Sequence, residues 1–145
     1  MRVLFDTSVI VAAMVESHPC HEKGLPWLKK AHARKVELII AAHTLAELYA
    51  VLSTLPVRPR ISPGIAWHLI HKNIVSSAKI ISLTPSEYSM TIKALSEKGL
   101  SGGIIYDALI AKTALKAKVD RLLTFNSKDF EKIWTGDKNV LYVPE

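Results

Sequence analysis

The sequence contains a single cysteine, Cys20, among its 145 residues. No internal disulfide can form, which excludes a disulfide-stabilised scaffold and makes the cytoplasm the expected compartment. The longest stretch without a charged residue, Ile61 to His71, is too short to span a bilayer. The apolar stretch over residues 3–15 is interrupted by Asp6 and lacks the n-region of a secretory signal. Repeats and inter-domain linkers are also absent, so we expect one domain over residues 1–145 and no membrane association.

Acidic residues are missing from the centre of the chain, between Glu47 and Glu87. The chain as a whole has a net charge of +6 and a pI near 9.5, which permits a polyanionic partner. Arg58 and Arg60 lie in the acid-free segment, on a proline-rich loop, and are the candidates for contacts with nucleic-acid phosphates. Trp67, in the same segment, either stacks on a base or packs in the core or a dimer interface. The mean hydropathy of +0.20 indicates apolar surface that a partner or a second copy covers.

Buried, β-branched strands alternate along the chain with segments of helical periodicity. Strands are expected at residues 2–6, 36–41, 79–83, 121–125 and, as a possible fifth, 139–143. Helices are expected at residues 7–15, 18–34 (one kinked helix or two short ones), 44–55, 65–76, 86–98 and 104–118. This alternation predicts an α/β fold with a parallel sheet that helices cover on both faces.

Polar side chains follow several of these strands. Asp6 ends the first strand, Glu47 lies in the helix after the second, and Asp107 lies in the first turn of the helix that begins near residue 104. Asn126 follows the fourth strand, and Asp129 comes three residues later. Functional groups of open α/β sheets gather beyond the carboxyl ends of the strands. We therefore expect these side chains to meet at one edge of the sheet.

Each acid also has a purely structural interpretation. Asp6 is placed to cap a helix, Thr44 and Glu47 fit a capping box, and Asp107 is placed to complement a helix dipole. Three carboxylates at one edge repel each other unless a cation lies between them. Oxygen ligands favour Mg²⁺ or Mn²⁺. His43 is the one histidine just past a strand, and no side-chain general base is assigned.

The motifs that contain these residues resemble those of a PIN domain. They are Asp6-Thr7-Ser8, Glu47 opening a helix, Tyr106-Asp107-Ala108 with Ala111, and the segment from Leu123 to Phe130. Their order and the chain length are most similar to VapC toxins of prokaryotic toxin–antitoxin pairs. The resemblance implies a three-layer α/β/α fold with a central, mostly parallel sheet of four to five strands. It also implies metal-dependent cleavage of RNA phosphodiester bonds, which makes Arg58 and Arg60 candidates for RNA binding.

The resemblance gives each polar residue a role. Asp6 and Asp107 match direct metal ligands, and Glu47 matches a ligand that binds directly or through water. Asn126 falls where many relatives carry a fourth acid, but an amide brings no negative charge, which leaves open whether one or two ions bind. Asp129 either compensates for this difference or is a surface turn residue. The expected supporting hydroxyls belong to Thr7, Ser8 and Thr124.

The resemblance further implies a homodimer and a cognate antitoxin whose tail covers the acidic groove. Three alternatives stay open. A PIN-type nuclease for RNA processing or decay is not separable from a toxin by sequence alone. A non-catalytic RNA-binding module would not need all three acids. A response-regulator-like signalling domain would need an acidic pair after its first strand and an aspartate after its third, and neither is present.

Overall fold

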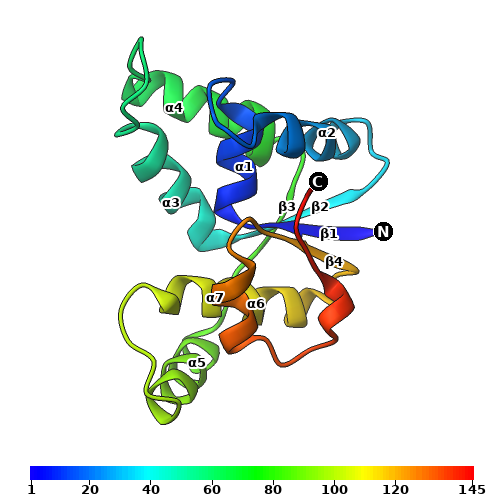
Figure 1. Ribbon diagram of the computed structural model, residues 1–145, viewed down its shortest axis with the longest axis vertical. Coiled ribbons are helices and arrows are strands. Elements are labelled where there is room, and N and C mark those ends of the chain that lie inside the picture. The colour runs from blue at the N-terminus through cyan, green and yellow to red at the C-terminus, as the bar shows by residue number, and fades with distance from the viewer.

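The computed structural model describes residues 1–145 and contains one sheet of five strands (Figure 1). The strands are β1 (Arg2–Phe5), β2 (Glu37–Ala41), β3 (Lys79–Ile81), β4 (Arg121–Leu123) and β5 (Leu141–Tyr142). Their order is β3-β2-β1-β4-β5, and every neighbouring pair is parallel. The predicted parallel sheet is confirmed, and β1 lies at its centre. All five carboxyl ends therefore share one edge.

Seven α-helices and two shorter helical segments connect the strands. They are α1 (Thr7–Met14), α2 (His21–His32), α3 (Ala42–Leu52), α4 (Pro63–Ile70), the π-helical segment η1 (His71–Val75), α5 (Pro85–Glu97), α6 (Ile104–Ala117), α7 (Ser127–Ile133) and the 3₁₀ segment η2 (Lys138–Val140). Helices α1 to α4 cover one face of the sheet, and α5 to α7 cover the other (Figure 1). The three-layer architecture is confirmed. None of the helices is long and apolar enough to cross a membrane.

The central strand is buried on both faces because its side chains enter two separate cores. Val3 and Phe5 pack with α1 and α3, whereas Leu4 packs with α6 and α7 on the opposite face. Neighbouring side chains of a strand point to opposite faces, so a strand covered on both sides is apolar without alternation. This burial fixes β1, and with it the position of the residue that follows the strand.

Helix α2 is a single helix over His21–His32 with Pro26 inside it. Its close approach to α1 depends on Gly24, because a Cβ atom at this position would lie 3.1 Å from both the Ala13 nitrogen and the Val9 oxygen. Gly64, at the start of α4, has open space around the same position. A side chain is therefore excluded at the α1–α2 crossing, where the backbones are in close contact.

The start of α3 differs from the prediction. The helix begins at Ala42, not at Thr44, and no side chain caps it. Glu47 therefore does not belong to a capping box. A capping box is found instead on α5, where Thr84 and Glu87 bond reciprocally to each other's backbone nitrogens at 3.1 and 2.9 Å. The structural interpretation of Glu47 is wrong, and its carboxylate is free for another role.

The strand order also tests the signalling alternative. Response-regulator-like domains place their strands in the order 2-1-3-4-5. In this chain β3 lies at the edge beside β2, and β4 is the neighbour of β1. The signalling alternative is therefore excluded by topology as well as by the missing acids.

Candidate active site

Three acids approach one another at the carboxyl edge of the sheet. Asp6 directly follows β1, Glu47 lies in the second turn of α3, and Asp107 lies in the first turn of α6. The negative charges of Asp6 and Glu47 both act on Asp107 and raise its pKa. Charges act on one another over about 10 Å before salt screens them, so the three acids lie within that range. The fold thus brings these three residues to one place, as the strand order leads us to expect.

Asp6 is the most deeply placed of the three, with 2% of its surface exposed. Its Oδ2 atom accepts hydrogen bonds from the hydroxyls of Ser8 and Thr124, each at 2.8 Å. Burial raises the pKa of Asp6, and these two hydrogen bonds oppose that effect. Its side chain does not cap α1, so the capping interpretation is wrong for the carboxylate. The two hydroxyls instead fix the orientation of a buried acid.

Those two hydroxyls are themselves held by the backbone after β4. Ser8 Oγ accepts from the Phe125 nitrogen at 3.1 Å, and Thr124 Oγ1 accepts from the Asn126 nitrogen at 2.9 Å. The network therefore joins the end of β1 to the end of β4, its neighbour in the sheet. Both hydroxyls lie beside the acid that the sequence analysis expects them to support.

Glu47 faces the first turn of α1. Its Oε2 atom accepts a hydrogen bond from Thr7 Oγ1 at 3.3 Å. Its Oε1 atom is buried and lies 3.1 Å from His43 Nε2. A buried carboxylate oxygen is costly unless another group meets it, and the imidazole of His43 is that group. Thr7 thus orients Glu47, while Ser8 orients Asp6.

Asp107 is partly buried, and its pKa is raised from 3.8 to about 7. Burial is the largest cause, followed by the charges of Asp6, Asp129 and Glu47, all of which disfavour a further negative charge. Helix-dipole complementation alone would favour the ionised form. The environment of Asp107 is therefore that of an acid cluster and not that of a simple helix terminus.

Asp129 and Asn126 both follow β4, and of the two only Asp129 carries a charge that acts on Asp107. Asn126 is exposed, and its side chain forms no hydrogen bond. Asp129, in the first turn of α7, raises the pKa of Asp107 and lines a cavity of about 400 Å³ together with it. Lys132 lies 3.6 Å from Asp129 in the same cavity. Asp129 therefore lies in a helix and not in a turn, although about half of its side chain is exposed (49%) as expected for a surface residue.

His43 lies beside these acids, although the sequence gives it no role. Its Nε2 atom lies 3.1 Å from Glu47 Oε1, one helical turn along α3, and its ring lowers the pKa of Asp107. The signal was present, since His43 is the one histidine just past a strand. Its contact with Glu47 depends on α3 starting at Ala42, which places both residues on the same face of one helix.

The donor set fits a divalent cation. Acids from three elements act electrostatically on Asp107, and one of their oxygens, Glu47 Oε1, is buried beside the imidazole of His43. Hard cations take such oxygens, and Mg²⁺ keeps several waters in its shell. No three acidic, histidine or cysteine side chains stand close enough together to enclose an ion by themselves. A cation at this place would therefore have few protein ligands, and water molecules would complete its shell.

The predicted nucleic-acid contacts lie elsewhere on the surface. Arg58 and Arg60 are exposed on the loop before α4 and form no ion pair. Trp67 on α4 is 56% exposed, and its ring lies 5.3 Å from that of His71. The core interpretation of Trp67 is therefore wrong, and its indole is available to a partner.

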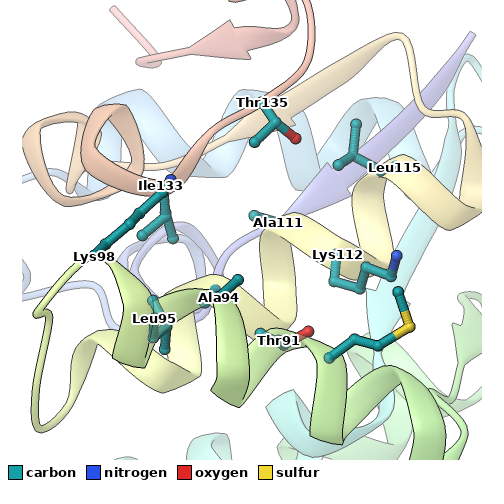
Figure 2. A pocket seen from close by; sticks show the side chains of 11 residues that line it. Thr91, Ala94, Leu95, Lys98, Ala111, Lys112, Leu115, Ile133 and Thr135 are labelled. Atoms are coloured by element: carbon teal, nitrogen blue, oxygen red, sulfur yellow. The ribbon is translucent and has the colours of Figure 1, made fainter.

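A second cavity, of about 210 Å³, is separate from the acids (Figure 2). Figure 2 shows it between α5, α6 and the segment after α7, with the methylene chains of Lys98 and Lys112 at its rim. It is lined mostly by apolar side chains and contains no acidic residue. It is thus no part of the acid cluster, although α6 contributes to both.

Comparison with known proteins agrees with this arrangement. The model of the PIN domain family matches residues 3–134. The protein named ribonuclease VapC40 of Mycobacterium tuberculosis is 40% identical over 119 residues, which is 82% of each chain. The crystal structure of M. tuberculosis VapC20, a toxin that cleaves the sarcin–ricin loop, superposes with a TM-score of 0.70 at 14% identity, over 92% of this chain and 96% of that one. VapBC2 of Rickettsia felis, bound to a DNA fragment from its promoter, gives a TM-score of 0.67 at 24% identity over the whole of both chains.

Proposed function

The chain belongs to the PIN domain family, and from this premise we propose that it is an endoribonuclease, the toxin of a VapBC-type toxin–antitoxin pair. The observation that carries the proposal is the acid cluster. Asp6, Glu47 and Asp107 come from three distant parts of the chain. Burial, and after it the charges of the other acids, raise the pKa of Asp107 to about 7. Burial and mutual repulsion of the acids destabilise the metal-free fold, and a cation that binds between them relieves this repulsion.

We infer that the cation is Mg²⁺ or Mn²⁺. Asp6 and Asp107 would bind it directly, and Glu47 and Asp129 would bind it through water molecules of its shell, with Asp129 supplying the charge that Asn126 lacks. When bound, a divalent ion supplies a water molecule that is more easily deprotonated and a positive charge beside the scissile phosphate. The chain's own contribution is orientation. Ser8 and Thr124 fix Asp6, and Thr7 fixes Glu47.

The distribution of charge along the chain supports a polyanionic substrate. The segment between Glu47 and Glu87 contains no acidic residue, and it presents Arg58 and Arg60 in solvent. We propose that these two guanidinium groups contact RNA phosphates away from the scissile bond. Phosphate contacts of this kind give affinity, while unpaired bases give sequence selection.

Two protein partners belong to the proposal. Helix α5 has three exposed apolar side chains, Tyr88, Met90 and Ile92. Leu95 is its only buried residue. Such an uncovered apolar helix supports a homodimer. The R. felis neighbour is a VapB–VapC assembly, which supports a cognate antitoxin for this chain, with its tail over the acid cluster. Light scattering of the isolated chain and of a co-expressed pair measures both assemblies.

The test is cleavage of a pool of structured RNAs by metal-stripped protein, with Mg²⁺ or Mn²⁺ then restored. Asp107→Asn is purified in parallel, and Glu131→Gln, an exposed acid on α7, is the matched control. Metal-dependent cutting by the wild type and Glu131→Gln but not by Asp107→Asn supports the proposal. Equal cutting by all three proteins would place the activity outside the acid cluster. Growth arrest on expression, relieved by the neighbouring antitoxin gene, separates a toxin from a nuclease of RNA processing or decay.

A further inference from the structure

Two residues other than glycine adopt a left-handed backbone conformation, and both are basic. They are Arg34, with a φ of 57°, and Lys118, with a φ of 51°. Each lies just after a helix, α2 or α6, and the N–H of the next residue bonds to a carbonyl five residues back, at 2.9 and 3.2 Å. Glycine is the usual residue at this position, because a Cβ atom strains the left-handed conformation. The chain thus accepts backbone strain at two positions that each present a cation.

These two residues lie at the same edge of the sheet, although their helices cover opposite faces. Helix α2 leads into β2 and α6 leads into β4, and both strands pair with β1 in parallel (Figure 1). A helix that leads into such a strand ends at the strand's amino end. Arg34 and Lys118 accordingly line one cavity of about 540 Å³. This amino edge is opposite the edge at which the acids lie.

Two more cations extend the positive charge along this edge. Lys35 lines the same cavity, and Lys72 lines an adjoining cavity of about 740 Å³ that Arg34 also borders. His32 Nε2 lies 3.1 Å from the Asn73 carbonyl oxygen, which joins the end of α2 to the segment that carries Lys72. All four basic residues are exposed, and none forms an ion pair. We name them the amino-edge patch: Arg34, Lys35, Lys72 and Lys118.

The acids at this edge have partners of their own. Arg2 Nε lies 3.3 Å from Glu37 Oε2, and the Arg2 backbone nitrogen donates to Asp120 Oδ2 at 2.7 Å. These contacts engage both acids within the fold. Four cations close to one another repel, and an anion between them relieves this repulsion. The amino-edge patch therefore favours an anionic partner that carries several charges.

We propose that the amino-edge patch binds phosphate groups of the RNA, at a distance from the acid cluster. The inference rests on the proposed function, because it takes the same RNA as its ligand. Lysine and arginine contacts to phosphates position a nucleic acid without reading its sequence. No aromatic side chain lines either cavity, whereas protein interfaces are enriched in aromatic residues and depleted of lysine. The patch thus fits a nucleic-acid backbone better than a protein surface.

The position of the patch sets a minimum length for an RNA that uses it. Strand β1 has four residues and separates the two edges by about 13 Å, at about 3.3 Å per residue. An RNA that is held at the acid cluster must extend at least this far to reach the patch. The patch therefore adds affinity for long or folded RNAs and none for a dinucleotide.

The experiment measures the salt dependence of binding to a pool of structured RNAs, in chelator so that no RNA is cut. One variant replaces all four patch residues by glutamine. The control replaces Lys23, Lys93, Lys98 and Lys138, which are exposed elsewhere, and has the same net charge. Each phosphate contact adds about 0.7 to the slope of log affinity against log salt for single strands. We expect the patch variant to lower the slope by about 1.4 to 2.8, and the control variant to leave it nearly unchanged.

A second variant separates the charge of the patch from its place in the fold. Arg34→Gly combined with Lys118→Gly removes two cations and also relieves the left-handed strain. Its Tm should be equal to or higher than that of the wild type, while its salt slope falls by about 1.4. A fall in RNA binding without a fall in Tm cannot come from damage to the fold.

Three results would overturn the inference. They are an unchanged slope in the glutamine variant, an equal fall in the control variant, and a patch-dependent affinity for duplex DNA that exceeds the affinity for RNA. Metal-dependent RNA cleavage by the wild type would, in each case, leave the proposed function intact. Absence of that cleavage together with absence of RNA binding would remove the proposed function and the inference with it.

Discussion

Replacing Asp107 by asparagine should stabilise the metal-free protein at neutral pH, although it removes a site residue. The pKa of Asp107 is about 7 in the folded chain, against 3.8 for an ordinary aspartate. Because the folded state holds this proton more tightly than the unfolded state, the ionised carboxylate opposes folding. The free energy of unfolding of the wild type should therefore fall as the pH rises from about 4 to about 7, and then stay level.

The size of the effect follows from the same values. A difference of about three pH units corresponds to about 4 kcal/mol if nothing screens the charge. Asp107 is partly exposed, and screening by water lowers this figure by about half, to about 2 kcal/mol. For a chain of this size, about 2 kcal/mol corresponds to a rise in Tm of about 5 °C. An asparagine side chain at this position keeps the shape and loses the charge, so Asp107→Asn should recover most of this amount.

The assay is urea unfolding of wild type and Asp107→Asn in chelator between pH 4 and 8, with Glu131→Gln as the control. The wild-type and Asp107→Asn curves should agree near pH 4 and diverge up to pH 7. Saturating Mn²⁺ should then reverse the order, because a ligand stabilises only the protein that binds it. A difference between the two proteins that does not change with pH would refute the electrostatic explanation.

Three further predictions concern other parts of the molecule. Thr124→Val removes the 2.8 Å hydrogen bond to Asp6 and the acceptor for the Asn126 nitrogen. It should lower the free energy of unfolding in urea by about 1–3 kcal/mol and weaken Mn²⁺ binding. Unchanged metal affinity would mean that Asp6 needs no such support. Gly24→Ala should cost about 1–3 kcal/mol because its Cβ meets α1 at 3.1 Å, whereas Gly64→Ala, in open space, should be neutral or slightly stabilising by thermal unfolding. Replacing Arg58 and Arg60 together by glutamine should lower the salt dependence of single-stranded RNA binding by a slope of about 1.4, and an unchanged slope would remove both from the interface.

The sequence predicts the site wherever the backbone alone determines position. Asp6 ends a buried strand, and parallel strands bring their carboxyl ends to one edge, so its convergence with Glu47 and Asp107 needs no knowledge of side chains. The first residue of α3 is harder to predict from the sequence. Both Thr44 and Thr84 precede a glutamate by three residues, yet only Thr84 caps a helix, because α3 extends directly from β2 and buries Thr44.

That shift of two residues determines where His43 lies relative to Glu47. In a helix starting at Thr44, His43 would lie outside the helix and without a fixed relation to Glu47. In the helix that starts at Ala42 the two residues are one turn apart. The position of Asp129 depends in the same way on the start of α7 at Ser127. This start brings Asp129 to the cavity that Asp107 also lines. Helix boundaries are the least reliable part of sequence-based prediction, and both residues lie next to one.

The bond between Thr124 and Asp6 joins residues that are 118 positions apart. During synthesis the first acid of the cluster emerges early, but the hydroxyl that orients it arrives only after β4 has been made and has paired with β1. Contacts this distant in sequence form late, because the long intervening loop must be closed first. A nascent chain would therefore pass through most of its translation without a complete acid cluster, and the activity proposed for that cluster would begin only on completion of the sheet.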